Sequence, residues 1–319
     1  MKNNIAPGPN GFSVEFFKAF WPRLRGDIKE MLDCLHAGTL ELWRLNYGVI
    51  ILLPKVKLAT NIKQFRPICP LNVIYKIITK TLTMRLTSVI DKVISPYQTA
   101  FIPGRNILEG VVILQEVMHE VRSSKSSGVF IKLDFGKAYD KVKWEFLEEV
   151  LHRKGFVEKW IQWINEAVRD GRVCIDLNGD RGEFFRSYKG LKHGDPLSPL
   201  LFNLVADALS EMLSRACAAG IINGLVPNLV EGGLSHLQYA DDTVILLQYS
   251  PEILKNIRLI LSTYEVLSGM KINYEKSEIL SIGLDEDILL AANILGCKVG
   301  ALPMRYLGMP VSSAKISKA

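Results

Sequence analysis

The stretch His236-Leu237-Gln238-Tyr239-Ala240-Asp241-Asp242-Thr243-Val244-Ile245-Leu246-Leu247 decides the fold of this chain. Two mostly apolar arms flank Ala240-Asp241-Asp242, a pattern that predicts a β-hairpin with a polar tip. Asp is a common turn residue, so a solvated turn is the ordinary explanation of the two adjacent carboxylates. The alternative is a metal site, which requires a third carboxylate nearby.

Asp134 is the candidate for that third carboxylate. It closes the apolar segment Val129–Leu133, which we expect to form a strand. If this strand pairs beside the hairpin, Asp134, Asp241 and Asp242 meet at one edge of a sheet. Carboxylate oxygens are ligands that Mg²⁺ prefers, and two such ions can clamp both oxygens of an in-line phosphoryl transfer. The spacing therefore favours the chemistry of nucleotidyl transfer.

The remaining pattern mixes amphipathic helices with short strands. Apolar residues at helical spacing predict helices over 24–35, 107–121, 157–168, 200–213 and 253–267. Val173–Leu177 and Glu183–Tyr188 flank Asn178-Gly179-Asp180 and predict a second hairpin. Asp195-Pro196 is expected to start the long helix. Helices together with antiparallel strands indicate the α+β class.

Composition excludes several classes of protein. The 319 residues are 48% hydrophobic and 23% charged, which is typical of a globular chain. No apolar run is long enough to cross a bilayer, so no membrane partner is expected. Five cysteines form no C-x-x-C pair, and the N-terminus shows no apolar signal core. We therefore expect an intracellular protein, in the nucleus or the cytoplasm.

Basic residues concentrate between Leu53 and Lys92. The stretch holds eight of them and a single acid, Asp91, although the whole chain carries a net charge of only +6. The basic residues are Lys55, Lys57, Lys63, Arg66, Lys76, Lys80, Arg85 and Lys92. Such a surface attracts a phosphate backbone or a nucleoside triphosphate. A solvated face of ordinary helices explains the charge equally well.

A series of motifs occurs along the chain in a fixed order. In that order they are Ala6-Pro7-Gly8-Pro9-Asn10-Gly11-Phe12, Phe65-Arg66-Pro67-Ile68 with Leu71-Asn72, Gln98-Thr99-Ala100-Phe101-Ile102-Pro103-Gly104-Arg105, Asp134-Phe135-Gly136-Lys137-Ala138-Tyr139-Asp140, Gly190-Leu191-Lys192-His193-Gly194-Asp195-Pro196-Leu197-Ser198-Pro199, Tyr239-Ala240-Asp241-Asp242, Gly269-Met270-Lys271-Ile272-Asn273-Tyr274-Glu275-Lys276-Ser277 and Tyr306-Leu307-Gly308-Met309-Pro310. With this series the chain resembles the reverse transcriptase domain of plant LINE-type non-LTR retrotransposons, from about Ala6 to Val311. The family usually has Asp in place of Asn10 and Gln in place of His193.

The resemblance implies one reverse transcriptase domain with the right-hand polymerase fold. Residues 1–128 are then mainly fingers with interleaved palm elements. Residues 129–319 are mainly palm, with an antiparallel palm sheet, and end after the primer-grip region. The thumb and the endonuclease segments are expected to be missing or incomplete in this chain.

The resemblance also assigns the metal ligands. Asp134 and Asp241 would hold two Mg²⁺ ions, with Mn²⁺ as an alternative, helped by the backbone carbonyl of Phe135. Asp242 would complete the acidic cluster. Lys276 matches the lysine of the closing motif, where it would protonate the departing pyrophosphate, and a solvated lysine is the competing interpretation.

Substrate contacts are implied at further positions. Tyr139 would be the steric gate that rejects a 2′-hydroxyl, so that dNTPs are selected; a buried core tyrosine is the competing interpretation. Arg66 and Lys55 would hold the triphosphate, for which a guanidinium is well suited. His193 and Gly194 would position the dNTP or the template. A separate segment, Tyr306, Leu307 and Gly308, would form the primer grip.

Two hypotheses of function therefore stand side by side. In the first, the chain is an RNA-directed DNA polymerase that works with an RNA template, a DNA primer and dNTPs. In the second, it is a catalytically inactive retrotransposon remnant that acts at most as a nucleic-acid-binding module. The three aspartates favour the first hypothesis, and the short length of the chain favours the second.

Overall fold

The computed structural model describes residue 3 and residues 7–283 and 287–312. The chain divides into two compact units that alternate along the sequence. Unit 1 contains 1–88 and 144–201, and unit 2 contains 89–143 and 202–319. The assignment of fingers and palm to residue ranges remains a prediction.

Helices form one part of unit 1. They are α1 (Val14–Ala19), α2 (Trp21–Ala37), α3 (Val73–Thr87), α7 (Trp144–Arg153) and α8 (Glu158–Val168), with short 3₁₀ turns at η1 (Leu42–Arg44) and η2 (Ile62–Gln64). Two buried aromatic residues of this part, Tyr75 and Trp163, form hydrogen bonds between helices. The hydroxyl of Tyr75 donates to the carbonyl of Ala167 at 2.7 Å, and Nε1 of Trp163 donates to the carbonyl of Leu35 at 3.0 Å. These bonds fix α3 and α2 to α8.

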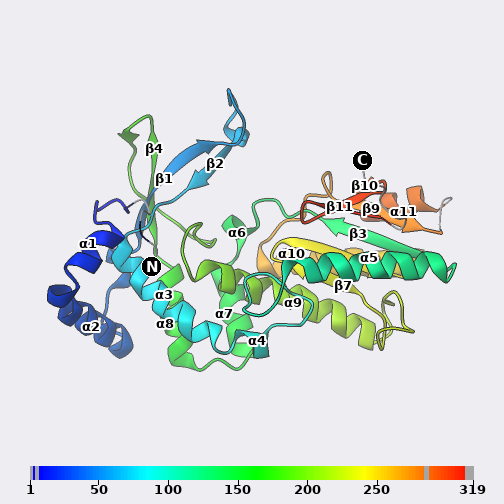
Figure 1. Ribbon diagram of the computed structural model, residues 1–319, viewed down its shortest axis with the longest axis horizontal. Helices are drawn as coiled ribbons and strands as arrows, with labels where there is room; N and C mark the ends of the chain where they lie inside the picture. The colour runs from blue at the N-terminus through cyan, green and yellow to red at the C-terminus, as the bar shows by residue number, and fades with distance from the viewer. Residues whose placement is uncertain (1–2, 4–6, 284–286, 313–319) are drawn as a thin grey trace. The chain divides into compact units, whose positions relative to one another are not determined.

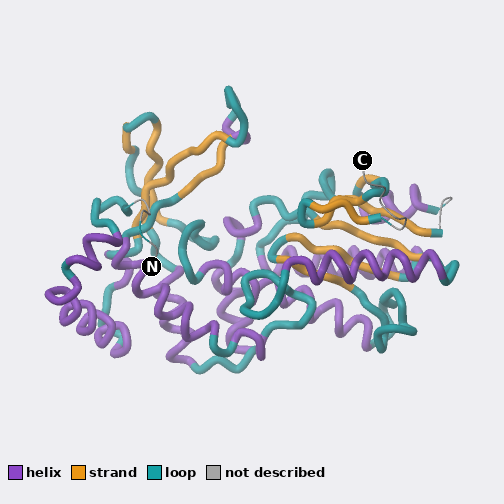
Figure 2. The backbone as a smooth tube through the Cα atoms, in the orientation of Figure 1, coloured by secondary structure: helices purple, strands orange, loops and turns teal. Residues whose placement is uncertain are grey.

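A five-stranded sheet forms the other part of unit 1. Its strands are β1 (Tyr47–Pro54), β2 (Phe65–Ile68), β4 (Arg172–Leu177), β5 (Asp180–Arg181) and β6 (Phe185–Arg186), in the order β2-β1-β4-β5 with β6 also paired to β4. Strand β1 runs antiparallel to β2 and parallel to β4. The tube drawing in Figure 2 shows β1 and β2 as a long two-stranded ribbon. The hairpin expected at Asn178-Gly179 is confirmed, whereas the strand expected over 183–188 shortens to β6.

Unit 2 is built on a second five-stranded sheet. Its strands are β3 (Gly128–Leu133), β7 (His236–Tyr239), β8 (Asp242–Leu247), β9 (Glu278–Ile282) and β10 (Lys298–Val299), in the order β10-β9-β3-β8-β7. A separate hairpin consists of β11 (Met304–Tyr306) and β12 (Met309–Val311). The helices are α4 (Ile90–Val93), α5 (Ile107–Ser123), α6 (Ala138–Lys141), α10 (Pro251–Ser268) and α11 (Ile288–Leu295). Helix α9 (Ser198–Ala218) belongs to unit 1 up to Leu201 and to unit 2 from Phe202 onward.

Helix α5 lies along one face of this second sheet, as Figure 1 shows. Its buried residues Leu114, Val117, Met118 and Val121 join one apolar cluster with side chains of β3, β7, β8, β9 and the β11–β12 hairpin. Alternate residues of each strand enter this cluster, since successive side chains of a strand point to opposite faces. The same alternation decides which polar side chains of the strands lie on the α5 face.

Two expectations about these elements need correction. Helix α9 begins at Ser198, and Asp195 precedes it as a cap whose carboxylate accepts from the amide of Ser198 at 3.0 Å. The sheet of unit 2 is also mixed, because β10 pairs with β9 in parallel while the other pairs are antiparallel as expected. In the part of the chain that the structure describes, no helix is both long enough and apolar enough to cross a membrane.

Candidate active site

The hairpin predicted at Ala240-Asp241-Asp242 is formed by β7 and β8. Tyr239 pairs with Asp242, so that Ala240 and Asp241 make the two-residue turn. Ala240 has a φ of 53°, in the left-handed region that residues with a Cβ seldom adopt. The backbone turns sharply at this point, and the two aspartates stand at the exposed end of the hairpin.

Strand β3 pairs with β8 of this hairpin. This is the arrangement that a metal site including Asp134 requires. Leu133 on β3 lies opposite Thr243 on β8, so the next residue, Asp134, is level with Asp242. By strand alternation both aspartates lie on the sheet face that α5 covers farther along. The structure therefore brings the three predicted carboxylates to one end of adjacent strands.

The main chain around Asp134 is fixed by the segment that precedes β9. The amide of Asp134 donates to Oγ of Ser277 at 3.1 Å, and its carbonyl accepts from the amide of Asn273 at 2.7 Å. Phe135 forms a bridge with Ile272, and its buried ring meets the ring of Tyr264 edge-on at 6.3 Å. These bonds hold the backbone and leave the carboxylate of Asp134 half-buried at the end of the strand.

The carboxylates influence one another electrostatically. Burial raises the pKa of Asp242, and the negative charges of Asp241 and Asp134 raise it further. Lys132 opposes the shift, since a nearby cation favours the ionised carboxyl. The three acids are thus close enough to repel one another when no cation is bound.

Lys132 is a site residue that sequence reasoning missed. It lies two positions before Asp134 on the same face of β3, and its Nζ donates to the carbonyl of Arg305 at 2.7 Å. One ammonium therefore contacts β11 and also lowers the pKa of Asp242. A single charged residue inside the apolar strand 129–133 was the signal that could have identified it.

The donor set fits a hard divalent cation in type and in position along the sheet edge. Carboxylate oxygens that repel one another are relieved when a cation binds between them. Across residues 7–283 and 287–312, however, no three side chains of His, Cys, Asp or Glu are gathered into a closed metal-binding group. The site has the ligands for a metal without being a preformed cage.

Tyr139 lies beside these carboxylates in α6. Its ring stacks on Phe202 with 4.4 Å between ring centroids and 6° between planes. Burial raises the pKa of the Tyr139 hydroxyl, and the charge of Asp241 raises it further. Phe202 is fully buried and was not singled out in the sequence, because it lies within the apolar stripe of α9.

The predicted primer grip is the turn of the β11–β12 hairpin. Tyr306 pairs with Met309, and the turn residues Leu307 and Gly308 have φ of 52° and 82°. Tyr306 is 1% exposed, and its hydroxyl has a pKa raised by burial and then by the charge of Asp242. The grip segment therefore approaches the acidic edge from the α5 face.

Lys276 is exposed in the turn before β9, where its amide donates to the carbonyl of Asn273 at 3.0 Å. This bond helps to shape the segment that holds Asp134. The predicted transfer of a proton from its ammonium stays a prediction.

The other predicted substrate residues belong to unit 1. Arg66 on β2 pairs with Leu53 on β1, and Lys55 follows two residues after Leu53. By strand alternation Arg66 and Lys55 share one face of the β1–β2 ribbon, and both are exposed. The ammonium of Lys55 donates to the carbonyl of Lys63 at 3.2 Å. The ribbon thus carries two cations side by side.

His193 and Gly194 lie in the exposed loop before α9, and Gly194 has a φ of 89°. The charged residues on either side of this pair are less exposed, since Lys192 is half-buried and Asp195 is buried. Burial lowers the pKa of Lys192 to about 8, against the raising effects of Cys69 and Asp195. Burial also raises the pKa of Asp195, whose carboxylate caps α9 through Ser198. His193 and Gly194 are therefore presented to solvent from an anchored loop.

Comparison with known families gives a clear result. Residues 53–311 match the model of the family described as reverse transcriptase (RNA-dependent DNA polymerase). This chain belongs to that family. The matched range contains the three aspartates, Tyr139 and the turn predicted to be the primer grip.

Relatives from mobile elements are similar over most of the chain. A transposon TX1 uncharacterized 149 kDa protein from Xenopus laevis is 29% identical over 98% of this chain and 24% of its own length. The Pol polyprotein from the type-2 retrotransposable element R2DM of Drosophila melanogaster is 27% identical over 85% of this chain and 24% of its own length. The chain is a reverse transcriptase domain of the non-LTR retrotransposon type, and it spans about a quarter of these relatives.

Solved structures agree on the fold. Telomerase from Candida tropicalis in complex with a fragment of telomeric RNA aligns with a TM-score of 0.55 and 14% identity, over 74% of this chain and 41% of that one. Apo telomerase from the same organism, truncated from its C-terminal domain, aligns with a TM-score of 0.53 and 16% identity, over 75% of this chain and 51% of that one. The α+β architecture is that of a reverse transcriptase.

Proposed function

We propose that this domain copies RNA into DNA at the end of β3, β7 and β8, with Asp134, Asp241 and Asp242 as the ligands of two Mg²⁺ ions. The observation that carries the proposal is the register of β3 with β8, which sets Asp134 level with Asp242. The family model supports the reaction, and the repulsion among the carboxylates supports the metal.

The ions, when bound, would make the primer 3′-hydroxyl a better nucleophile and neutralise charge at the transferring phosphate. The protein residues then hold and orient the reactants. The carbonyl of Phe135 would supplement the carboxylates, and Lys132 favours the ionised, metal-binding form of Asp242. Lys276 is proposed as the proton donor to pyrophosphate, from the turn that also anchors Asp134.

Selection of deoxynucleotides is proposed for Tyr139. Its ring is held flat against Phe202, so it cannot swing away from an incoming sugar without breaking that stack. The charge of Asp241 raises the pKa of the Tyr139 hydroxyl, which supports a position of Tyr139 next to the proposed metal ligands. A 2′-hydroxyl would meet the face or edge of the ring, which disfavours ribonucleotides.

Contacts with the remaining substrate groups are proposed for both units. Arg66 and Lys55 share one face of the β1–β2 ribbon, where they would bind the triphosphate of the dNTP. His193 and Gly194 would position the templating base pair. Tyr306, Leu307 and Gly308 would hold the primer strand through the β11–β12 turn.

The biological setting is proposed from the relatives. RNA and a primer are the partners that the family implies. A 67-residue stretch that is 37% identical to an uncharacterized mitochondrial protein from Arabidopsis thaliana supports an origin in a plant retrotransposon. Copying of an element's RNA would take place in the nucleus or the cytoplasm.

Primer extension tests the proposed reaction. The purified chain is mixed with an RNA template, an annealed DNA primer, dNTPs and Mg²⁺, and duplex binding is measured separately by fluorescence anisotropy. We expect Asp241→Asn to lower the extension rate about 1000-fold, equivalent to ~4 kcal/mol of transition-state stabilisation, with duplex binding retained.

The matched control is Asp180→Asn, which changes an aspartate next to the turn of the other hairpin and should leave extension unaltered. If the wild type binds the duplex but adds no nucleotide under Mg²⁺ or Mn²⁺, the polymerase proposal is wrong for this chain. The inactive nucleic-acid-binding remnant would then be the better description.

A further inference from the structure

The segment between α4 and α5, residues 94–106, contains two consecutive buried polar side chains. Gln98 is fully buried and Thr99 is 7% exposed, although neither lies in a helix or a named strand. This segment, called the strap below, runs beside β7. The amide of Thr99 donates to the carbonyl of Gln238 at 3.0 Å, and the amide of Gln238 donates to the carbonyl of Tyr97 at 2.9 Å. The strap therefore pairs with the outer edge of the hairpin that carries Asp241.

The side chain of Gln98 reaches the turn itself. Its Oε1 accepts from the amide of Ala240 at 2.8 Å, and its Nε2 donates to the carbonyl of Ala240 at 3.4 Å. One carboxamide thus bonds both backbone groups of the residue that immediately precedes Asp241. Oε1 also accepts from the amide of Ala100 at 3.0 Å, which ties the side chain back to the strap.

The backbone conformation of Ala240 needs hydrogen bonds from residues outside the turn. Its left-handed φ of 53° is unfavourable for a residue with a Cβ, and such conformations persist where the surroundings over-determine them. Ala240 has no polar side chain with which to stabilise its own turn. Gln98 supplies the hydrogen bonds that the sequence of the turn lacks.

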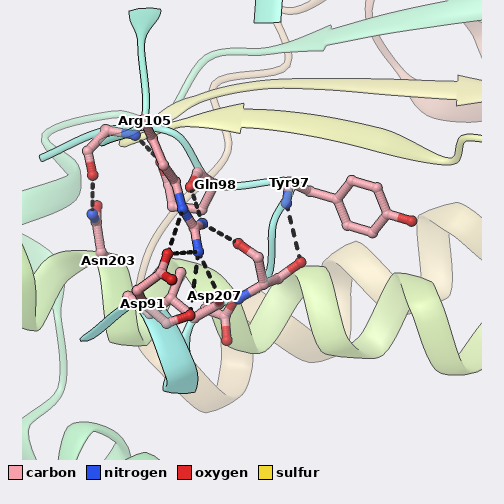
Figure 3. A network of polar contacts seen from close by, with 9 residues as sticks. Asp91, Tyr97, Gln98, Arg105, Asn203 and Asp207 are labelled. Atoms are coloured by element: carbon pink, nitrogen blue, oxygen red, sulfur yellow. Dashed lines mark hydrogen bonds and ion pairs between the residues drawn. The ribbon is translucent and has the colours of Figure 1, made fainter. Parts of the chain in front are cut away.

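A second set of contacts holds the strap in place, as Figure 3 shows. The guanidinium of Arg105 donates to the carbonyl of Gln98 at 2.6 Å and to the carbonyl of Ile94 at 3.1 Å, and it pairs with the carboxylate of Asp91 at 2.8 Å. Asp207 on α9 accepts from the amide of Ser95 at 2.8 Å. On the same helix, Nδ2 of Asn203 donates to the carbonyl of Ala100. The backbone of Gln98 is therefore fixed from several sides.

We propose that Gln98 is a positioning residue for the polymerase reaction: through its carboxamide the strap sets the backbone of the Ala240-Asp241 turn and thereby the direction of the Asp241 and Asp242 carboxylates. The inference rests on the proposed role of these aspartates as metal ligands. Arg105 acts indirectly, because it bonds the backbone carbonyl of Gln98 and has no described bond to the turn.

This role differs from ordinary support of a sheet edge. The backbone bonds of Tyr97 and Thr99 with Gln238 already secure the edge of β7, and they do not depend on the side chain at position 98. The carboxamide adds contacts only at Ala240 and within the strap. Its loss should consequently disturb the turn while the strands remain paired.

The test compares three variants of the 319-residue chain with the wild type. Gln98→Met keeps the volume and removes both hydrogen bonds to Ala240. Gln98→Glu keeps the acceptor for the amides of Ala240 and Ala100. Gln115→Met is the matched control, because Gln115 on α5 clamps the backbone amide and carbonyl of Ser312 in the same two-way manner without contacting the strap or the turn.

Amide hydrogen exchange of the peptide 236–247, measured without metal, is the first readout. We expect Gln98→Met to exchange at least tenfold faster than the wild type in the turn, Gln98→Glu to stay within threefold of it, and Gln115→Met to be unchanged there. Unaltered exchange in Gln98→Met, or equal acceleration in Gln115→Met, would overturn the proposal. If Gln98→Met fails to fold, Gln98→Glu decides by the same readout, and exchange more than tenfold faster than the wild type rejects the proposal.

Primer extension is the second readout. A displacement of reacting groups by about 1 Å costs on the order of 100-fold in rate, so Gln98→Met should lower kcat by about that factor. The KM for dNTPs and the Kd for the primer–template duplex should change less than threefold. A kcat within threefold of the wild type contradicts the positioning role. Inactive wild type would instead refute the proposed polymerase function, and the exchange measurement would still judge the contact between Gln98 and the turn.

Discussion

The two hairpins that the sequence predicted make their tight turns in opposite ways. In the β4–β5 hairpin of unit 1, the turn residues are Asn178 and Gly179, with φ of 57° and 91°. These residue types tolerate the left-handed conformation, and the amide of Gly179 donates to Oδ1 of Asp176 at 2.9 Å. This turn is exposed and is stabilised by its own residues.

In the β7–β8 hairpin of unit 2, Ala240 occupies the left-handed position and is buried. Its backbone groups are bonded by Gln98, 142 residues earlier in the chain. The difference suggests a rule: a turn whose own residues suit its geometry serves the fold, whereas a turn held by distant side chains is where a functional constraint acts.

The largest difference between the two hairpins is expected from Tyr139, which lies beside the β7–β8 turn. Tyr139→Ala should lower the preference for dNTPs over rNTPs, measured as the ratio of kcat/KM values, by about 100-fold, or ~2.7 kcal/mol. The physical reason is the loss of the ring that Phe202 holds in place. Tyr139→Phe is the control, because it keeps the ring and should keep the preference.

Phe202→Leu sharpens the same prediction. It leaves Tyr139 intact but removes the stacked partner, so the preference should fall by a smaller factor of about 10. If Phe202→Leu has no effect while Tyr139→Ala does, the ring of Tyr139 is held by something other than this stack. Loss of selectivity in Tyr139→Phe would show that the hydroxyl, and not the ring, rejects ribonucleotides.

Much of the fold could be predicted because long apolar stripes leave a periodic signal. The stripes over 107–121 and 253–267 became α5 and α10, and the alternation around Asp241 became β7 and β8. The strands β10, β11 and β12 have only two or three residues each, too few for a period to emerge. Their existence depends on packing against β9 and α5, which no local pattern records.

The candidate site likewise contains residues that the sequence could predict and residues that it could not. Asp134, Asp241 and Asp242 were visible because carboxylates at strand ends are conspicuous in an apolar context. The contact of Gln98 with Ala240 was invisible, since it joins residues 142 positions apart without a periodic pattern. Lys132 could have been found from its place in an apolar strand, two residues before Asp134. Phe202 could not, because it is one apolar residue among many in α9.

Substitutions that exchange glycine and alanine between the two turns also test the rule, and their expected effects are smaller. Gly179→Ala should lower the free energy of unfolding by about 1 kcal/mol, because a Cβ is unfavourable at its left-handed φ. The space around a Cβ at Gly179 is open, so a clash adds nothing to this cost. Chemical denaturation measures the loss, and the rate of primer extension should not change.

Ala240→Gly should lower the rate of primer extension and leave the stability of the fold nearly unchanged. Relief of left-handed strain is offset by the lost burial of a methyl group and by the entropy of glycine in the unfolded chain, so stability should stay within about 1 kcal/mol of the wild type. The freer turn should still lower kcat about fivefold, since small displacements of positioned groups are costly. Destabilisation by several kcal/mol with normal kcat would show that the methyl group of Ala240 matters more than the order of the turn.

The smallest effect concerns the pH dependence of stability without metal. The pKa of Asp242 is raised above its ordinary value of 3.8, chiefly by burial and then by Asp241 and Asp134. The folded protein therefore binds this proton more tightly than the unfolded chain, and the associated stability is fully present below pH 3.8 and is lost as the pH rises through the folded-state pKa. Asp242→Asn carries no charge to bury, so its Tm should exceed that of the wild type at pH 7, with a gap that narrows toward pH 4.

Asp180→Asn in the other hairpin is the matched control for this thermal measurement. The response of the Tm to Mg²⁺ supplies a second comparison. A cation that binds the folded site stabilises it by mass action, so Mg²⁺ should raise the Tm of the wild type at pH 7 more than that of Asp242→Asn. An equal response of both proteins to Mg²⁺ would argue against Asp242 as a ligand. A Tm gap that is the same at pH 4 and pH 7 would instead mean that the ionisation of Asp242, opposed by burial and by the charges of Asp241 and Asp134, contributes nothing to the instability of the metal-free turn.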